Sequence, residues 1–296
     1  MKRKQKLLFF WIGGLIIIAC LAWLALSLLN KTAVNVQRDV QYGMAQGQPI
    51  TLDIFTPPNQ LAFNRPAIVF VHGGAWAAGD KRDFEDMARG LAEQGYVGFS
   101  VSYRLVMEDA NQFPAQLDDV QRAVRWIRLH ASEYRINPQR LCAIGGSAGG
   151  HLVSLLGTSD TRDNSDAELA PYSSRVNCVV AMYAPQDLTV PLVQGSAVDA
   201  AVIDLIGTTR EENMQAFAHA SPLFHIDTNT APFLIVHGVQ DPLVPLDQAE
   251  RFYAALQAAG IPSDLLIFED EGHSILRTEN VNLFIKRLLA FLKTYR

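Results

Sequence analysis

The sequence predicts an α/β fold in which helices cover both faces of a mostly parallel β-sheet. Short apolar runs, typical of strands that are buried on both faces, recur along the chain. They alternate with longer segments in which apolar residues return every three or four positions, as they do in amphipathic helices. Alternating strands and helices form parallel sheets with right-handed crossovers. With 296 residues, 49% of them hydrophobic, the chain can form one large domain around a single core.

The elements follow one another regularly after residue 31. Alternating apolar and polar residues over 34–43 and 50–58 predict an antiparallel pair of strands, the second of which ends at Pro57 and Pro58. Continuous apolar runs then predict buried strands, and the amphipathic segments between them predict helices. Further strands are expected at 67–71, 96–104, 140–144, 176–185, 233–238 and 263–270, and helices at 81–95, 113–134, 151–157, 245–260 and 279–296.

Two segments interrupt this alternation. The segment 157–175 is polar and is predicted to be a loop. The segment 188–222 is irregular, holds one or two short helices in our interpretation, and would form a small cap over a pocket. No internal repeat or low-complexity linker divides the chain after residue 31, so 31–296 are expected to form one domain.

The first 30 residues carry a membrane signal. Four basic side chains occur within the first six residues, and the 23 residues of 7–29 carry no charge. At 1.5 Å per residue, such a helix spans roughly 34 Å, which is enough to cross a bilayer. This predicts an uncleaved, single-pass transmembrane helix with its basic end in the cytoplasm and the remaining domain on the periplasmic or extracellular side. A lipoprotein signal at Cys20 and a cleaved secretory signal ending near Ser27 are alternatives.

The charge balance excludes one class of partner. The net charge is −5, and the first six residues contribute +4, so residues 7–296 hold 21 basic and 30 acidic residues, a net charge of −9. A domain that acidic has no basic surface for the phosphates of a nucleic acid. The sequence leaves the oligomeric state open.

The three cysteines do not form a disulfide framework. Cys142 and Cys178 lie in short apolar, strand-like segments, and we interpret them as two buried thiols that pack as small hydrophobic side chains. A disulfide between them is the alternative. The cysteines therefore leave the redox compartment open.

A glycine-rich turn carries the strongest functional signal. Ser147 lies in the stretch Gly-Gly-Ser-Ala-Gly that follows a predicted strand and begins a predicted helix. This is the setting of a nucleophile elbow, in which a tight turn holds the serine hydroxyl outward and Gly145 and Gly149 leave room for it. The alternative, a phosphate-binding loop, lacks the Gly-Lys-Ser/Thr that such a loop requires.

A serine nucleophile needs a base, and His273 is the histidine best placed to serve. It lies in a loop between the last predicted strand and the last helix, at the carboxyl edge of the sheet. His151, on the helix four residues after Ser147, is a weaker candidate. The other histidines are interpreted as loop-orienting, structural or surface residues: His72, His130, His219, His225 and His237.

The histidine in turn needs a carboxylate that fixes its tautomer and stabilises its cation. Asp241 follows the strand at 233–238 at the same edge of the sheet, and Asp187 after the preceding strand is the rival. Glu269 and Asp270 are too close to His273 in sequence. The chosen order, Ser147 then Asp241 then His273, is the order of the α/β hydrolases.

An oxyanion hole is expected in the loop after the strand at 67–71. The backbone N–H group of Gly74, with that of Gly73 or Ala75, would join the N–H group of Ala148 to bind a developing negative charge. The alternative is a turn without a binding role.

Together these motifs resemble those of a known family. The stretches HGGAW, SYRL, FPAQLDDV, GGSAGGHL, HGVQDPLVP and EGHS are similar to those of α/β-hydrolase esterases of the hormone-sensitive-lipase-like and bacterial BD-FAE type, over residues 36–296. The resemblance implies an eight-stranded sheet and hydrolysis of carboxylic esters without a cofactor or a metal. Ala75 departs from the pattern, because lipase-like members often have a third glycine there.

The resemblance favours a serine esterase that acts on a small-molecule ester. Short acyl chains are expected, because the segment 188–222 offers little surface to cover a long one. An amide hydrolase with the same triad, similar to an arylformamidase or a peptidase, is the alternative within the same chemistry. A non-catalytic binding module on the same fold is the alternative from another class, and such modules usually lack a triad member.

Overall fold

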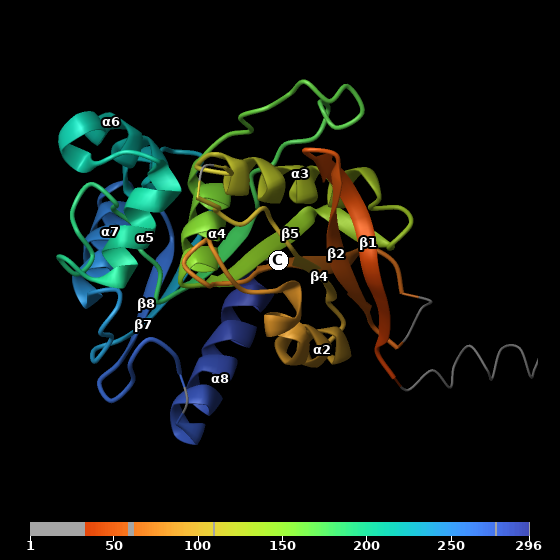
Figure 1. Ribbon diagram of the computed structural model, residues 1–296. Coiled ribbons are helices and arrows are strands. Elements are labelled where there is room, and N and C mark those ends of the chain that lie inside the picture. The colour runs from red at the N-terminus through yellow and green to blue at the C-terminus, as the bar shows by residue number, and fades with distance from the viewer. Residues whose placement is uncertain (1–32, 59–61, 109, 276, 296) are drawn as a thin grey trace, which may run out of the picture.

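One eight-stranded sheet runs through the molecule (Figure 1). The computed structural model describes residues 33–58, 62–108, 110–275 and 277–295. The strand order is β1-β2-β4-β3-β5-β6-β7-β8, in which β1, β2 and β4 pair antiparallel and the other neighbours pair parallel. The strands are β1 (Asn35–Ala45), β2 (Gln48–Thr56), β3 (Arg65–Val71), β4 (Val97–Val101), β5 (Ile136–Gly146), β6 (Cys178–Met182), β7 (Phe233–Gly238) and β8 (Ser263–Phe268).

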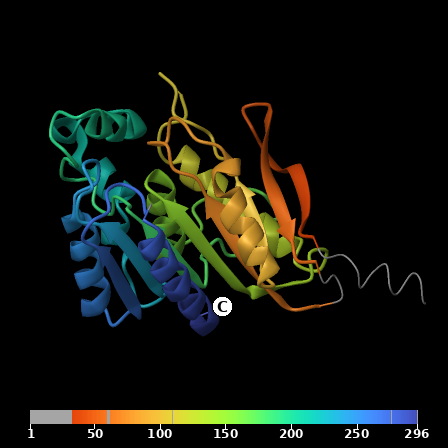
Figure 2. The same ribbon diagram turned by 90° about the horizontal axis from the view of Figure 1, so that it is seen from below.

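Helices cover both faces of this sheet, as Figures 1 and 2 show. One hydrophobic core lies between the sheet and α3, α4 and α7, and a second lies between the sheet and α2 and α8. Both cores follow from strands such as β3 and β7, whose residues are buried on both sides. The helices are α2 (Glu85–Glu93), α3 (Ala115–Leu129), α4 (Ala148–Thr158), α5 (Ala197–Ile206), α6 (Arg210–Ala220), α7 (Leu246–Ala258) and α8 (Thr278–Tyr295), with short 3-10 helices η1 (Lys81–Phe84) and η2 (Pro222–His225).

The topology brings distant loops to one edge of the sheet. The chain leaves β3 through α2 on one face and reaches β5 through α3 on the other face. The order of the strands therefore reverses between β3 and β5, and ligand sites in open α/β sheets form at the carboxyl ends of strands at such a point. The loops that follow β3, β5, β7 and β8 all leave from this edge because these strands are parallel.

The two core cysteines are joined by a disulfide. Cys142 on β5 and Cys178 on β6 are direct partners in the parallel register, with their Cα atoms 4.6 Å apart. This separation lies within the range that a disulfide spans. The interpretation of Cys142 and Cys178 as two free thiols is therefore wrong, because pairing of the strands places them opposite each other.

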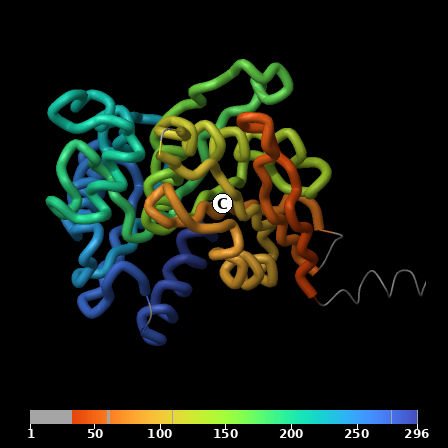
Figure 3. The backbone as a smooth tube through the Cα atoms, viewed as in Figure 1, coloured from red at the N-terminus to blue at the C-terminus, as the bar shows by residue number. Residues whose placement is uncertain are grey.

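The segment 188–222 forms α5 and α6 and connects to η2. It lies at the end of the molecule that holds α7 and β8, far from the β1–β2 hairpin (Figure 3). Ser196 and Thr209 cap the first turns of the two helices through their side-chain oxygens. These caps explain why an irregular sequence still forms two helices.

The prediction of a membrane-spanning helix has to be corrected. Residues 7–29 lie outside the described residues. Among the helices of the described part of the chain, none combines the length and the apolar composition needed to cross a bilayer. The helix α8 is 18 residues long, but it is amphipathic and carries Glu279, Lys286, Arg287 and Lys293. The prediction of a transmembrane helix, a single-pass membrane location and a membrane partner is overturned by this finding.

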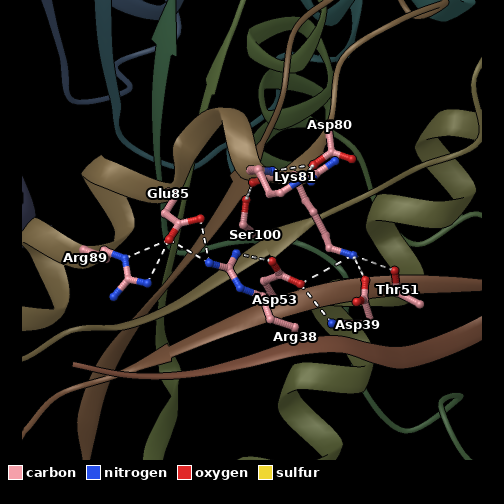
Figure 4. Close-up of polar contacts among 10 residues, drawn as sticks. Arg38, Asp39, Thr51, Asp53, Asp80, Lys81, Glu85, Arg89 and Ser100 are labelled. Atoms are coloured by element: carbon pink, nitrogen blue, oxygen red, sulfur yellow. Dashed lines mark hydrogen bonds and ion pairs between the residues drawn. The ribbon is translucent and has the colours of Figure 1, made fainter. Parts of the chain in front are cut away.

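A network of charged side chains ties the antiparallel edge of the sheet to η1 and α2 (Figure 4). Asp53 on β2 is fully buried and lies 2.6 Å from Arg38 of β1 and 3.4 Å from Lys81 of η1. Arg38 also contacts Glu85 of α2 at 2.6 Å, and Lys81 contacts Asp39 at 2.5 Å. Because buried carboxylates require compensating partners, this network determines how β1 and β2 pack against the start of α2.

We expect Asp53→Ala to lower the free energy of unfolding by about 3–5 kcal/mol, the cost of removing one partner of a buried ion pair. Urea unfolding would measure the change. Asp160→Ala is the matched control, because its carboxylate is paired with Arg175 but 83% exposed, and it should change stability by less than about 1 kcal/mol. Equal effects of the two substitutions would contradict the assigned role of Asp53.

Candidate active site

Ser147 occupies a sharp turn between β5 and α4. Its φ of 54° and ψ of −124° are strained for a residue with a side chain. The Ser147 N–H group donates to the Met182 carbonyl at 2.9 Å, which ties the turn to the end of β6. A Cβ atom on Gly145 would lie 2.4 Å from the Gly149 carbonyl oxygen, and one on Gly149 would lie 2.0 Å from the Val71 carbonyl oxygen. Neither position has room for a side chain, so the glycines permit the turn.

The loop after β3 packs directly against this turn. A Cβ atom on Gly73 would lie 3.0 Å from the Gly146 carbonyl oxygen and 3.3 Å from the Cβ of Ser147. Gly74, Ala75 and Trp76 follow with φ of 105°, 50° and 58°. Three successive residues with positive φ turn the chain sharply. The Gly74 carbonyl accepts hydrogen bonds from the N–H groups of Ala77 and Ala78. The loop thus brings the backbone of Gly73 close to the side chain of Ser147.

His151 holds this loop in place from α4. The indole N–H of Trp76 donates to His151 Nδ1 at 3.2 Å, and His151 Nε2 donates to the Ala220 carbonyl at 2.7 Å. These two contacts require a neutral imidazole. Burial lowers the pKa of His151 to about 4, which favours that form. His151 is therefore engaged in packing, and it does not contact the Ser147 hydroxyl.

His273 lies between Ser147 and Asp241. The Ser147 hydroxyl donates to His273 Nε2 at 2.8 Å, and His273 Nδ1 donates to Asp241 Oδ2 at 2.7 Å. The carboxylate can only accept, so it fixes the proton on Nδ1 and leaves Nε2 free to accept a proton. The structure thus brings together the three residues that the sequence analysis selected from different loops.

The environment of Asp241 favours its charged form. The side chain is fully buried, and burial alone would raise the pKa of Asp241. Hydrogen bonds from His237, His273 and the amides of Val244 and Leu243 outweigh burial and hold that pKa well below its usual range. Asp241 is therefore a carboxylate whenever the protein is near neutral pH.

The structure separates the rejected candidates from this site. Asp187 forms an ion pair with Arg251 at 2.5 Å and accepts from Thr189, so its carboxylate is occupied elsewhere. Asp270 lies in an exposed ion pair with Arg277 at 2.9 Å. In residues 33–58, 62–108, 110–275 and 277–295, no group of three or more His, Cys, Asp and Glu side chains is arranged to hold a metal ion.

The sequence analysis interpreted His237 as a structural residue but did not identify its contact with Asp241. This fully buried histidine lies at the end of β7, and its Nε2 is 2.8 Å from the Val244 carbonyl and 3.4 Å from Asp241 Oδ2. The Nε2–H group donates to the carbonyl and approaches the carboxylate, so His237 helps hold the loop that carries Asp241. Its position four residues before Asp241 was the feature of the sequence that could have indicated this contact.

A cavity of about 760 Å³ opens at Ser147. Gly73, Gly146, Met182 and Tyr183 line it near the serine, and side chains from α2 and α8 line the rest. None of its lining residues belongs to 188–222. The expected cap at 188–222 therefore does not contribute to this cavity.

The family model described as BD-FAE matches residues 52–256. The chain belongs to the BD-FAE family. This confirms the resemblance drawn from the sequence motifs to α/β-hydrolase esterases. The match covers the Ser147 turn, the loop after β3 and Asp241, while His273 lies beyond its end.

Individual relatives of this BD-FAE chain agree with that assignment. It is 32% identical over 231 residues to the probable carboxylic ester hydrolase LipM of Mycobacterium tuberculosis, covering 74% of this chain and 51% of LipM. It is 30% identical over 234 residues to dipeptidyl peptidase family member 6 of Caenorhabditis elegans, covering 72% of this chain and 29% of that protein. The chain spans about half the length of the first curated relatives it matches.

A solved structure shares both fold and sequence with this BD-FAE chain. The propionate-bound form of the thermophilic esterase Est2 of the Planctomycetes species Thermogutta terrifontis superposes with a TM-score of 0.72 at 26% identity. The match covers 88% of this chain and 93% of Est2. The shared architecture therefore extends over almost the whole of the described domain.

We expect Gly149→Ala to lower the free energy of unfolding by about 3 kcal/mol or more, because the new methyl group would collide with the backbone of Val71 and His72. Thermal and urea unfolding would measure the loss. Gly90→Ala is the control, since a Cβ atom there meets no atom within 4 Å. It lies within α2 and should raise stability by up to about 1 kcal/mol. A stable Gly149→Ala variant would contradict the packing described for the turn.

Proposed function

We propose that this chain hydrolyses carboxylic esters through an acyl-enzyme formed on Ser147. The observation that carries the proposal is the hydrogen-bonded series of Ser147, His273 and Asp241 beside a large cavity. Esterases among the relatives support the same chemistry. We assign the catalytic domain to residues 31–296.

In the proposed reaction, Ser147 Oγ attacks the carbonyl carbon of the ester while its proton passes to His273 Nε2. The resulting imidazolium is stabilised by the Asp241 carboxylate, which stays ionised. The bond between the carbonyl carbon and the leaving oxygen then breaks, and that oxygen takes the proton from His273 Nε2. A water molecule next gives a proton to His273 and attacks the acyl carbon, which releases the acid and restores the Ser147 hydroxyl.

The proposed oxyanion hole uses the N–H group of Ala148 with that of Gly74 and a neighbour, Gly73 or Ala75. Ala148 is the first residue of α4, where backbone N–H groups have no partner within the helix. The partial positive charge of the helix N-terminus favours an anion there. The close approach of Gly73 to Ser147 supports a role for the loop after β3. Losing one such donor costs about 2.7–4 kcal/mol of transition-state stabilisation.

We propose that the ester substrate carries a short acyl group. The support is the propionate that the Est2 structure holds. Hydrolysis of amides by the same residues is the second candidate, and it is favoured by the similarity to a dipeptidyl peptidase family member. A panel of acetate and butyrate esters beside formylated amines and peptides would separate the two, because the preferred class should show the higher kcat/KM.

Ser147→Ala should lower kcat/KM for acetate and butyrate esters by about 10⁶-fold, as in serine proteases that lack their nucleophile. The alanine fits a turn that is built for small side chains, so the melting temperature should change little. Stopped assays with purified protein would measure the rate, and unfolding curves would check the fold. Full activity of the variant would refute both the esterase and the amidase proposal.

Asp241→Asn should lower kcat by about 10⁴-fold, because an amide cannot hold His273 in the required tautomer. Asp187→Asn is the matched control. It removes the charge that pairs with Arg251, away from His273, and should lower kcat by less than tenfold. A large effect at Asp187 with a small one at Asp241 would reverse the assignment of the acid.

A further inference from the structure

The cavity at Ser147 continues as an apolar groove between α2 and α8, the two helices that cover one face of the sheet (Figure 2). Met87 and Leu91 of α2 form one wall. Phe284, Ile285 and Leu288 of α8 form the opposite wall. These side chains come from elements about 200 residues apart in the sequence, so no single sequence motif indicated the groove.

The groove leaves apolar surface in contact with water. Ile285 is 45% exposed, whereas Phe284 and Leu288 beside it belong to the core. Apolar side chains that line a cavity from two facing helices are typical of a ligand-binding groove. Its continuity with the Ser147 hydroxyl indicates that the ligand is part of the substrate.

We propose that the groove binds the alkyl chain of the leaving alcohol of a neutral ester. This rests on the proposed function. The leaving oxygen must receive its proton from His273 Nε2, so the alcohol portion lies on the side of His273. Ser274 and Ile275 follow His273 directly and line the groove. An alkyl chain attached to the leaving oxygen therefore enters the groove, while a short acyl group stays near Ser147.

The rim of the groove selects against negative charge. Asp83 of η1 and Asp86 and Glu93 of α2 line one side of the groove and are exposed. Carboxylates at the rim repel a ligand with an anionic end and leave neutral chains unaffected. The alkyl chain is therefore expected to end without a carboxylate or a phosphate.

The size of the groove fits a chain of about eight carbons. A methylene group is about as large as the share of volume of one water molecule in the liquid, about 30 Å³. An acetyl group would then fill roughly a tenth of the 760 Å³ cavity or less. The wall that α8 forms from Val281 to Leu289 is about 12 Å long at 1.5 Å per residue. Eight carbons in a zigzag of roughly 1.5 Å bonds, each advancing about 1.25 Å along the chain, extend to about 9 Å.

The test compares esters that lengthen one portion at a time. Ethyl acetate, butyl acetate and octyl acetate share the acyl group, and ethyl octanoate lengthens the acyl group instead. Acid release by the full chain would be followed in a pH-stat below the solubility limit of each ester. Ethanol, butanol and octanol are primary alcohols of similar leaving ability, so differences in kcat/KM report binding. Each buried methylene adds about fourfold in affinity, and we expect octyl acetate to exceed ethyl acetate by at least about 100-fold. Ethyl octanoate should gain less than tenfold.

A groove-filling variant makes the test specific. Gly90 of α2 lines the groove, and a Cβ atom there meets no atom within 4 Å. Gly90→Phe should lower the ratio of kcat/KM for octyl acetate to that for ethyl acetate by at least tenfold. Met87→Gln, which puts an amide in the same wall, is the second variant should Gly90→Phe fail to fold. Ala254→Phe adds the same ring to the exposed side of α7, outside the groove, and should leave the ratio unchanged.

The outcomes separate this inference from the proposed function. A gain for ethyl octanoate in place of octyl acetate would overturn the assignment to the leaving alcohol. Equal rates for all four esters, with activity still dependent on Ser147, would overturn the inference and leave the esterase proposal standing. The same result is expected if another segment of this chain or a second copy fills the groove. Absence of Ser147-dependent hydrolysis of every ester would instead refute the proposed function.

Discussion

The strained, left-handed backbone of Ser147 is the constraint on which the packing around the site depends. The turn brings Gly145 against Gly149, and it brings Gly149 against the end of β3, at separations that exclude any side chain. The same crowding draws Gly73 to the serine. A single backbone conformation therefore determines how closely β3, β5 and α4 approach one another. The core on both sides of the sheet supplies the stability that holds this strain.

Much of the architecture was predictable because the local signals agree with the global fold. Strand and helix segments alternate along the sequence, and each predicted strand corresponds to a strand of the sheet. Ser147, Asp241 and His273 each follow a strand of the parallel part of the sheet, so one edge had to receive all three. Their hydrogen bonds agree with that reasoning, while their catalytic roles stay predictions.

What the sequence did not reveal depends on contacts between distant segments. To predict the disulfide, one would have to know the register of β5 against β6. To predict the role of Asp53, one would have to know that side chains of β1 and η1 lie beside it. The groove could not be predicted because it forms where α2 and α8 lie side by side, and these helices are far apart along the chain. The membrane prediction rested on hydrophobic length in residues 7–29, and the described helices give it no support. Periodicity reports which face of an element is buried, but not which element covers it.

The buried His151 gives the loop after β3 a sensitivity to acid. It joins Trp76 of that loop to the Ala220 carbonyl at the end of α6, and both contacts use the neutral imidazole. The pKa of His151 is about 4 in the fold and near 6.5 in an unfolded chain, so the unfolded chain binds the proton first as the pH falls. The stabilisation is complete above pH 6.5 and diminishes progressively between pH 6.5 and 4. Acidification is therefore expected to weaken the contacts that join the loop after β3 to α6 before it protonates the Asp241 carboxylate, through a residue that takes no part in the proposed reaction.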